Sequence, residues 1–257
     1  MSHIRAAFLV VVLLGGCESP VPAATASPPV TEATATSAKP ATTPVTTTPV
    51  ATNVPTQASA ALDPSRGQEI GLVFEAYLSP HQEAGEEEET PKMVPKVFKS
   101  TTPSQDRTAR EAAGHRGHGQ IRFTKDLSRA YVDVKLEGVD PAAINMFHIH
   151  CGNPGVLGPI LIDFAHSVDI QKELVDGVLS VELKNEHLVK VVDHGHGLVG
   201  AFTAGCPIPD DAPASRVSTI AGMLQYAVAR QLYFNLHTTG QTYFGDLRGQ
   251  VHPVTQP

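Results

Sequence analysis

Alternating hydrophobic and polar positions run through the second half of the chain. Between residues 131 and 137, Val132, Val134 and Leu136 alternate with polar or charged residues. Successive side chains of a strand point to opposite faces, so this pattern predicts a half-buried antiparallel strand. The same pattern returns at residues 179–184, which we expect to form a second strand of this kind.

Two further segments have patterns typical of strands. Residues 159–164 form a short, mostly apolar run, which predicts a central strand buried on both faces. In residues 232–237, Leu232, Phe234 and Leu236 share one face. The opposite face of that strand carries Tyr233, Asn235 and His237.

Only residues 218–230 have a helical pattern. Ile220, Met223 and Ala227 recur at spacings of three and four, and Ser218 is placed to cap the start. Several strands punctuated by Gly and Pro, with one helix, predict a mainly β fold. We therefore expect an antiparallel, Greek-key-like β-sandwich or barrel with one short helix.

The first residues have the pattern of a bacterial lipoprotein signal peptide. Arg5 precedes an apolar run over residues 6–14, which is too short to span a bilayer as a helix. The run ends in Leu-Gly-Gly-Cys, which resembles a lipobox, so we expect cleavage after residue 16 and lipid on Cys17. The alternative is an ordinary secretory signal with an incidental cysteine. We expect a protein held at the bacterial cell envelope, outside the cytoplasm, and Glu18 favours the outer membrane or cell surface.

Residues 17–62 differ in composition from the rest of the chain. Ala, Thr, Pro, Ser and Val dominate them, and the charged residues are Glu18, Glu32 and Lys39. Such a segment cannot bury enough apolar surface to offset the entropy cost of ordering, so we expect a disordered tether. Residues 63–257 then form one domain by length.

Charge excludes one class of partner for that domain. The charges before residue 63 cancel, so the domain carries the entire formal net charge of −7. Phosphate neutralisation needs a basic face, so we expect no nucleic-acid partner. The acidic run at residues 86–89 is predicted to be a solvated loop, and residues 82–113 to be a surface loop.

Two cysteines remain once Cys17 is assigned to the lipid. Cys151 and Cys206 would lie in an oxidising compartment, where a disulfide is expected. The bridge would close a loop of 55 residue steps, worth about 4 kcal/mol in the chain-entropy model. The alternative makes Cys151 a thiolate ligand beside His150.

Two motifs resemble the CHRD domain, a module named from chordin and common in bacterial secreted proteins. The first is Phe147-His148-Ile149-His150 followed by a Gly-Pro turn, and the second is Asn235-Leu236-His237-Thr238 with a later Arg248-Gly249 pair. The resemblance implies a β-domain similar in outline to the copper/zinc superoxide dismutase sandwich, whose copper-binding strand also reads Phe-His-x-His. It therefore raises the hypothesis of a metal site.

Histidines are placed where such a site would need them. On a strand, His148 and His150 share a face and lie about 7 Å apart along it. His237 would be a third ligand if its strand neighbours theirs. Imidazole clusters suit copper or zinc, and the Irving–Williams order favours Cu(II). Four further candidates, expected in glycine-rich loops over the site, are His115, His118, His194 and His196.

Three functions are compatible with these features. The first is a non-enzymatic binding module for a protein, a glycan or a metal ion, with no catalytic residues. The second is a copper-dependent redox protein of the dismutase type, with Arg248 as its active-site cation. The third is a structural envelope lipoprotein whose histidines only brace the fold. Asp163 and Asp246 have no partner that the sequence identifies.

Overall fold

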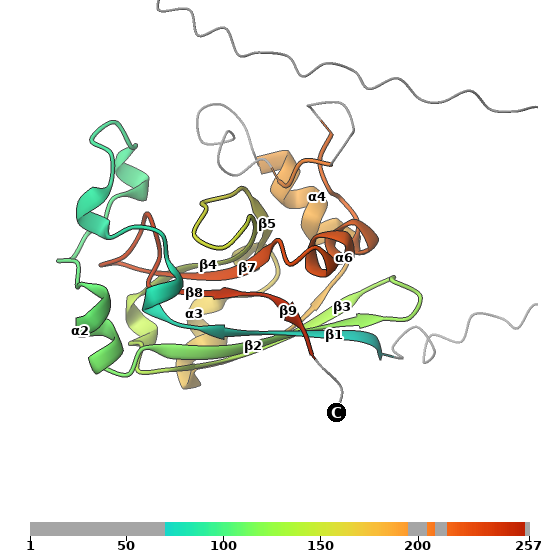
Figure 1. Cartoon of the computed structure of the whole chain (residues 1–257), viewed down its shortest axis with the longest axis horizontal. Helices are drawn as coiled ribbons and strands as arrows, with labels where there is room; N and C mark the ends of the chain where they lie inside the picture. Colours follow the sequence, from blue (N-terminus) through green and yellow to red (C-terminus); the bar gives the residue numbers. More distant parts are fainter. Residues whose placement is uncertain (1–69, 195–204, 209–214, 255–257) are drawn as a thin grey trace, which may run out of the picture. The chain divides into compact units, whose positions relative to one another are not determined.

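The computed structural model describes residues 70–194, 205–208 and 215–254. Figure 1 shows two antiparallel β-sheets stacked face to face. The predicted β-sandwich is therefore confirmed. The five-stranded sheet has the order β6-β3-β2-β1-β9 and consists of β1 (Ile70–Leu78), β2 (Arg116–Thr124), β3 (Ala130–Glu137), β6 (Val178–Leu183) and β9 (His252–Pro253). The four-stranded sheet has the order β5-β4-β7-β8 and consists of β4 (Ile144–Cys151), β5 (Ile160–Asp163), β7 (Leu232–Thr238) and β8 (Leu247–Gln250).

The predicted alternation produces the inner faces of both sheets. Val132, Val134 and Leu136 of β3 are buried, whereas the residues between them face outward to different degrees. Across the core, Phe147 and Phe234 of the other sheet are fully buried and their rings lie 6.0 Å apart. One apolar core therefore holds the two sheets together.

The two sheets also meet at one edge. The backbone of Ser79, just after β1, exchanges two hydrogen bonds with Arg248 of β8, at 2.9 and 3.2 Å. This bridge fixes the position of β8 relative to β1. It also holds the backbone of Arg248, whose side chain reaches the candidate site described below.

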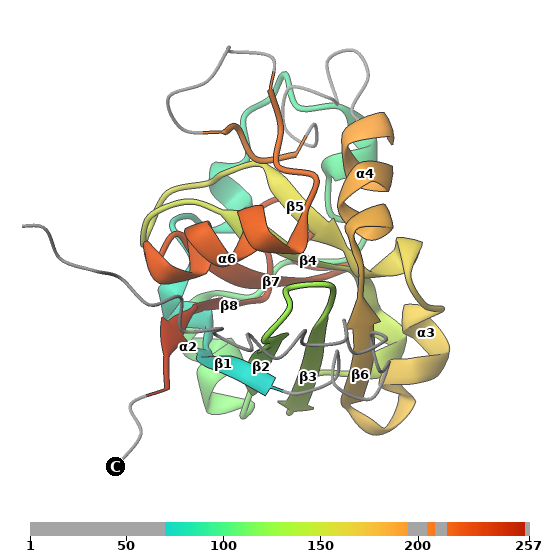
Figure 2. The same ribbon diagram turned by 90° about the vertical axis from the view of Figure 1, so that its right-hand side faces the viewer.

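The run predicted as a central strand is β5, and that placement was wrong. β5 lies at the edge of the four-stranded sheet, paired only with β4. Its residues are nevertheless apolar because helix α4 (Asn185–His194) lies against it (Figure 2). A covering helix thus buries a strand that the sheet leaves open on one side.

The predicted helix is α6 (Ile220–Val228), but it is not the only one. Its cap is Thr219 instead of Ser218, because the Thr219 hydroxyl accepts a hydrogen bond from the Gly222 amide at 3.1 Å. Most of the further helices have only three to six residues, too few to show a helical period, but α4 has 10 residues against 9 in α6 and was simply missed. They are α2 (Arg107–Ala112), α3 (Ile170–Glu173), α4 and the 3₁₀ turns η1 (Pro80–Gln82), η2 (Glu87–Glu89), η3 (Lys96–Phe98), η4 (Pro141–Ala143), η5 (Phe164–His166) and η6 (Leu174–Asp176).

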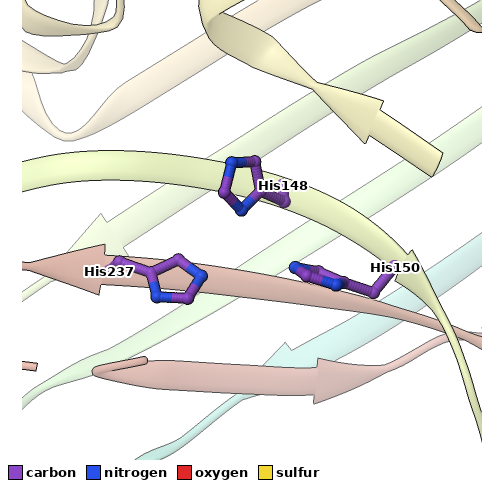
Figure 3. Close-up of side chains that lie close together, drawn as sticks. All are labelled: His148, His150 and His237. Atoms are coloured by element: carbon purple, nitrogen blue, oxygen red, sulfur yellow. The ribbon is translucent and has the colours of Figure 1, made fainter. Parts of the chain in front are cut away.

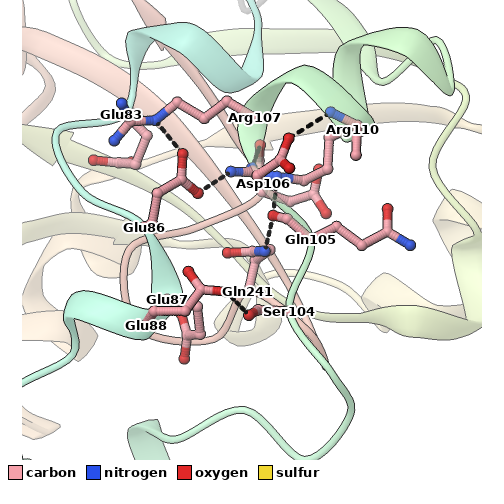
Figure 4. A network of polar contacts seen from close by, with 12 residues as sticks. Glu83, Glu86, Glu87, Glu88, Ser104, Gln105, Asp106, Arg107, Arg110 and Gln241 are labelled. Carbon is pink, nitrogen blue, oxygen red and sulfur yellow. Dashed lines mark hydrogen bonds and ion pairs between the residues drawn. The ribbon is translucent and has the colours of Figure 1, made fainter.

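Residues 82–113, here called the cover segment, are folded onto the sandwich through a polar network (Figure 4). Glu86 forms ion pairs with Arg107 at 2.8 Å and with the buried Arg110 at 3.1 Å. Glu87 is buried and accepts a hydrogen bond from the Ser100 hydroxyl at 2.6 Å. The prediction of a solvated acidic run was therefore wrong for these two residues, because their charges have partners within the segment.

Several expectations fall on parts of the chain outside the described residues. These are the signal peptide (1–16), the lipid on Cys17, the tether to residue 62 and the side chains of His194 and His196. Among the described residues, no helix combines the length and the apolar character needed to cross a membrane.

Candidate metal centre

The outer face of the four-stranded sheet carries polar side chains that are buried. His148 and His150 of β4 and His237 of β7 are 4, 8 and 4% exposed. The outer face of a sandwich is normally solvated and polar. Here the cover segment and neighbouring loops exclude solvent from it, so these imidazoles lie in an enclosed, weakly polar environment.

Strand pairing brings the three histidines together, as the sequence required for a common site. β4 and β7 are neighbours, and His237 lies opposite Met146, next to the position of His148. The ring of His148 lies 5.3 Å from that of His150 and 5.2 Å from that of His237 (Figure 3). One ring nitrogen from each residue lies within 4.8 Å of the other two.

Two of the rings are fixed in a defined tautomer by backbone carbonyls. The Nδ1–H of His150 donates to the carbonyl of Gly158 at 2.9 Å, and that of His237 donates to the carbonyl of Thr242 at 2.9 Å. Because a carbonyl only accepts, each Nδ1 carries the hydrogen and each Nε2 presents a lone pair. Such carbonyl partners orient imidazoles that bind metals.

Three ring nitrogens lack a hydrogen-bond partner in this site. They are Nε2 of His150, Nε2 of His237 and Nδ1 of His148, and all three are buried. A buried polar atom without a partner costs about 1–3 kcal/mol. Three such atoms converging on one point are therefore unfavourable unless something binds between them.

Asp163 lies on the far side of His148. β4 and β5 pair His148 with Asp163, and Nε2 of His148 lies 3.8 Å from a carboxylate oxygen. The other oxygen lies 3.8 Å from Nε2 of His166. No partner for Asp163 could be identified from the sequence. The β4–β5 pairing shifts by one residue between Ile149 and His150, so regular counting from His150 and Ile160 would have placed Ile162, not Asp163, opposite His148.

Burial keeps the three imidazoles neutral. Loss of solvation is the largest cause in each case: it lowers the pKa of His150 to about 3, that of His237 to about 4 and that of His148 well below its usual range. The neighbouring rings lower the pKa of His148 further. Neutral imidazole is the form that binds a metal ion, so the rings are ready to bind at neutral pH.

A pocket of about 620 Å³ opens in front of the rings. Its walls come from the cover segment, from β4, from the β4–β5 connection, from α4 and from the β7–β8 loop. The lining residues are mostly apolar and include Val94, Phe98, Met146, Leu157, Ile160, Val191 and Tyr243.

Arg248 does not line that pocket. Its guanidinium carbon lies 3.5 Å from the centre of the Tyr233 ring. The His150 ring is stacked on the same tyrosine ring, with the two ring centres 5.0 Å apart. The guanidinium donates to the carbonyls of Asn153 at 2.9 Å and Val156 at 3.2 Å. Arg248 therefore braces the β4–β5 connection, in place of the active-site cation that the sequence suggested.

The additional histidine candidates lie elsewhere. His118 is on β2 in the other sheet, with its ring tilted against that of Tyr77, and not in a loop over the site. His115 is bound through Nδ1 to Asp246 at 2.7 Å. Neither belongs to the cluster of three. Asp246 is buried and also accepts from the Thr238 hydroxyl at 3.0 Å, so it too has partners that the sequence did not reveal.

The expected disulfide is present between Cys151 and Cys206, whose Cα atoms lie 6.0 Å apart. Cys151 follows His150 directly but faces the core, on the opposite side of β4. Cys151 is therefore not a thiolate ligand. The bridge ties the end of the histidine strand to residues 205–208.

The donor set suits copper or zinc. Imidazole nitrogens bind both ions, and three of them leave a position for a further ligand. Two ligands of one tetrahedral zinc lie about 3.3 Å apart, given Zn–N distances of about 2.0–2.1 Å. The present separations of up to 4.8 Å are longer than that value, so the rings would have to move closer together to hold one ion.

Comparison with known proteins places the chain in a family. The CHRD domain matches residues 98–251, more than half of the chain and the whole histidine-bearing sheet. Neither the curated proteins nor the solved structures gave a significant match. The chain therefore belongs to the CHRD domain family.

Proposed function

We propose that this protein is a non-enzymatic metal-binding module that holds one copper or zinc ion with His148, His150 and His237. The observation that carries the proposal is the convergence of three buried ring nitrogens that have no hydrogen-bond partner. A bound ion would give each of them a partner at once.

The hydrogen bonds of the cluster favour a metal site over a structural brace. A histidine that only braces a sandwich can use both ring nitrogens in hydrogen bonds to neighbouring segments. Here His150 and His237 each use one nitrogen to hold the ring in position, through the carbonyls of Gly158 and Thr242. The other nitrogen points toward the neighbouring rings (Figure 3).

We also propose that the module works outside the cytoplasm, attached to a membrane through lipid on Cys17. The Cys151–Cys206 disulfide supports an oxidising compartment. The composition of residues 17–62 supports a tether between the lipid and the domain. A protein or glycan at the envelope remains a further partner compatible with this position.

Calorimetric titration of the metal-free chain with zinc, and separately with copper, tests the metal site. The wild-type chain is expected to bind one ion, and replacing His148 and His150 together by Gln is expected to abolish that binding. The matched control is His118→Gln with His252→Gln, which removes two histidines from the opposite sheet and should bind as the wild type does.

Thermal unfolding of the metal-free variants separates the two roles of the histidines. A metal site predicts that His148→Gln with His150→Gln folds with little change in unfolding temperature. If the wild type takes up no ion and the double variant unfolds, the histidines are structural braces and the proposal is wrong.

A further inference from the structure

We infer that the pocket in front of the three histidines binds a small organic anion with an apolar body, whose anionic group completes the coordination of the metal ion. This inference rests on the proposed metal site and adds the class of ligand that the site takes. It follows from the size of the pocket, the chemistry of its walls and the charge of the bound ion.

The pocket is larger than metal binding requires. Its volume of about 620 Å³ lies within the range of about 300–1,000 Å³ typical of small-molecule sites. A water molecule that completes a metal coordination sphere takes only about 30 Å³. The remaining space fits an organic molecule of several to a dozen non-hydrogen atoms.

The walls of the pocket match an apolar body. Val94 and Phe98 come from the cover segment, Met146 from β4, Leu157 from the β4–β5 connection and Val191 from α4. These residues come from separate parts of the chain, so the apolar lining is not one exposed strip. The polar groups gather where the three histidines lie, so a ligand with one polar end has a single favourable orientation.

The positive charge of the bound metal ion favours a ligand whose polar end, next to the histidines, is anionic. Three neutral imidazoles leave a divalent ion with its full charge of +2. Among the described lining residues, Asp163 is the only carboxylate and there is no lysine or arginine. Unneutralised charge is costly in a weakly polar pocket. A carboxylate or phenolate ligand offsets it while placing its apolar part against the walls.

Calorimetry with octanoate and acetate tests this inference, because the two share a carboxylate and differ in the apolar chain. Titrations use the full chain at saturating zinc and the metal-free chain in parallel. Octanoate is expected to bind the zinc form about 100-fold more tightly than acetate does. It is also expected to bind the zinc form at least about tenfold more tightly than the metal-free form, because the carboxylate then has a cation to bind.

A matched pair of substitutions locates the binding. Leu157 in the pocket wall is 41% exposed, and Leu72 on β1 of the other sheet is 47% exposed. Leu157→Asp places a negative charge beside the bound anion, so octanoate affinity should fall at least about tenfold. Leu72→Asp should bind octanoate as the wild type does.

Three other results would each contradict one part of the account: the ligand site, the coordination of the metal by the anionic group, or the metal site itself. If the chain binds one zinc ion but octanoate binds no better than acetate, the pocket is not a ligand site and the metal proposal stands. If octanoate binds equally well with and without zinc, the anionic group does not coordinate the metal and the inference is wrong. If the chain takes up no zinc, the proposed function itself is wrong, and this inference is wrong with it.

Discussion

Gly158 orients His150 at the candidate site and has no room for a side chain. A Cβ atom at this position would lie 1.6 Å from the carbonyl oxygen of Cys151. The same residue accepts from His150 Nδ1 at 2.9 Å, and its amide donates to the Tyr233 hydroxyl at 3.0 Å. The close approach of the two backbones therefore sets the position of the carbonyl that fixes the imidazole.

We predict that Gly158→Ala weakens metal binding by about 10–100-fold, the usual effect of losing a hydrogen bond to a metal-binding imidazole. The added methyl group forces the connection away from β4, and the carbonyl moves away from His150. Competition with a chelator of known affinity measures the change. An unchanged dissociation constant would show that the carbonyl does not position the ring.

The buried imidazoles also predict how the stability of the metal-free chain depends on pH. In the unfolded chain a histidine takes up a proton as the pH falls below about 6.5. In the folded chain His237 does so only near its lowered pKa of about 4, and His150 near 3. Between these values the unfolded state binds more protons, so acidification destabilises the fold.

We predict that this effect reaches about 1.4 kcal/mol per pH unit for each such histidine, between about pH 6 and pH 4. The measurement compares the free energy of unfolding of the metal-free wild type with that of the His150→Gln variant across this range. The wild type should lose stability more steeply on acidification. Equal slopes would mean that the His150 ring is not held neutral.

At the scale of elements, the cover segment determines the site as much as the strands do. Ser100 accepts from the Thr242 amide at 3.1 Å and donates to Glu87, which also accepts from the Tyr243 amide at 3.1 Å. The carbonyl of Thr242 in turn fixes His237. The segment thus holds the β7–β8 loop against the third histidine.

We predict that Ser100→Ala lowers the free energy of unfolding by about 1–2 kcal/mol and speeds hydrogen exchange at the Thr242 amide. The substitution leaves that amide and the Glu87 carboxylate with one partner fewer. Ser104→Ala is the matched control in the same segment, because the Ser104 hydroxyl donates to the exposed carboxylate of Glu88. Equal effects of the two substitutions would contradict the role given to Ser100.

The alternation of hydrophobic and polar residues predicted those strands that have one buried face and one solvent-facing side. β3 and β6 alternate buried and outward residues, so their sequence alone indicated strands and inner faces. β7 is buried along its whole length, and its outward residues Asn235 and His237 lie beneath other parts of the chain. The sequence placed His237 on the correct face, but it could not show that this face is covered.

The cover segment was not predictable in the same way. Its structure depends on ion pairs and hydrogen bonds between residues far apart in sequence, such as Arg110 with the carbonyl of Gly245 at 3.4 Å. The spacing of hydrophobic and polar residues within a short segment cannot indicate contacts with distant residues. The acidic run at residues 86–89 therefore predicted a solvated loop, whereas Glu87 of that run is buried, as is Arg110 later in the segment.

At the scale of the whole molecule, the proposed attachment to a membrane depends on Cys17. We predict that Cys17→Ser leaves the protein unlipidated, so that it no longer partitions into the detergent phase, while the folded domain and its Cys151–Cys206 disulfide are unchanged. Mass spectrometry of the mature N-terminus checks this. A wild-type protein whose mature N-terminus is unmodified and differs from Cys17 would contradict the anchor.

Anomalous X-ray scattering at the zinc edge, from crystals of the zinc-loaded full chain, tests the central claim most directly. We predict one strong peak at about 2.0–2.1 Å from His148 Nδ1, His150 Nε2 and His237 Nε2, with the electron density of a further ligand on the side of the pocket. A peak at other residues, or no peak between these three imidazoles at saturating zinc, would contradict the claim that they form a metal centre.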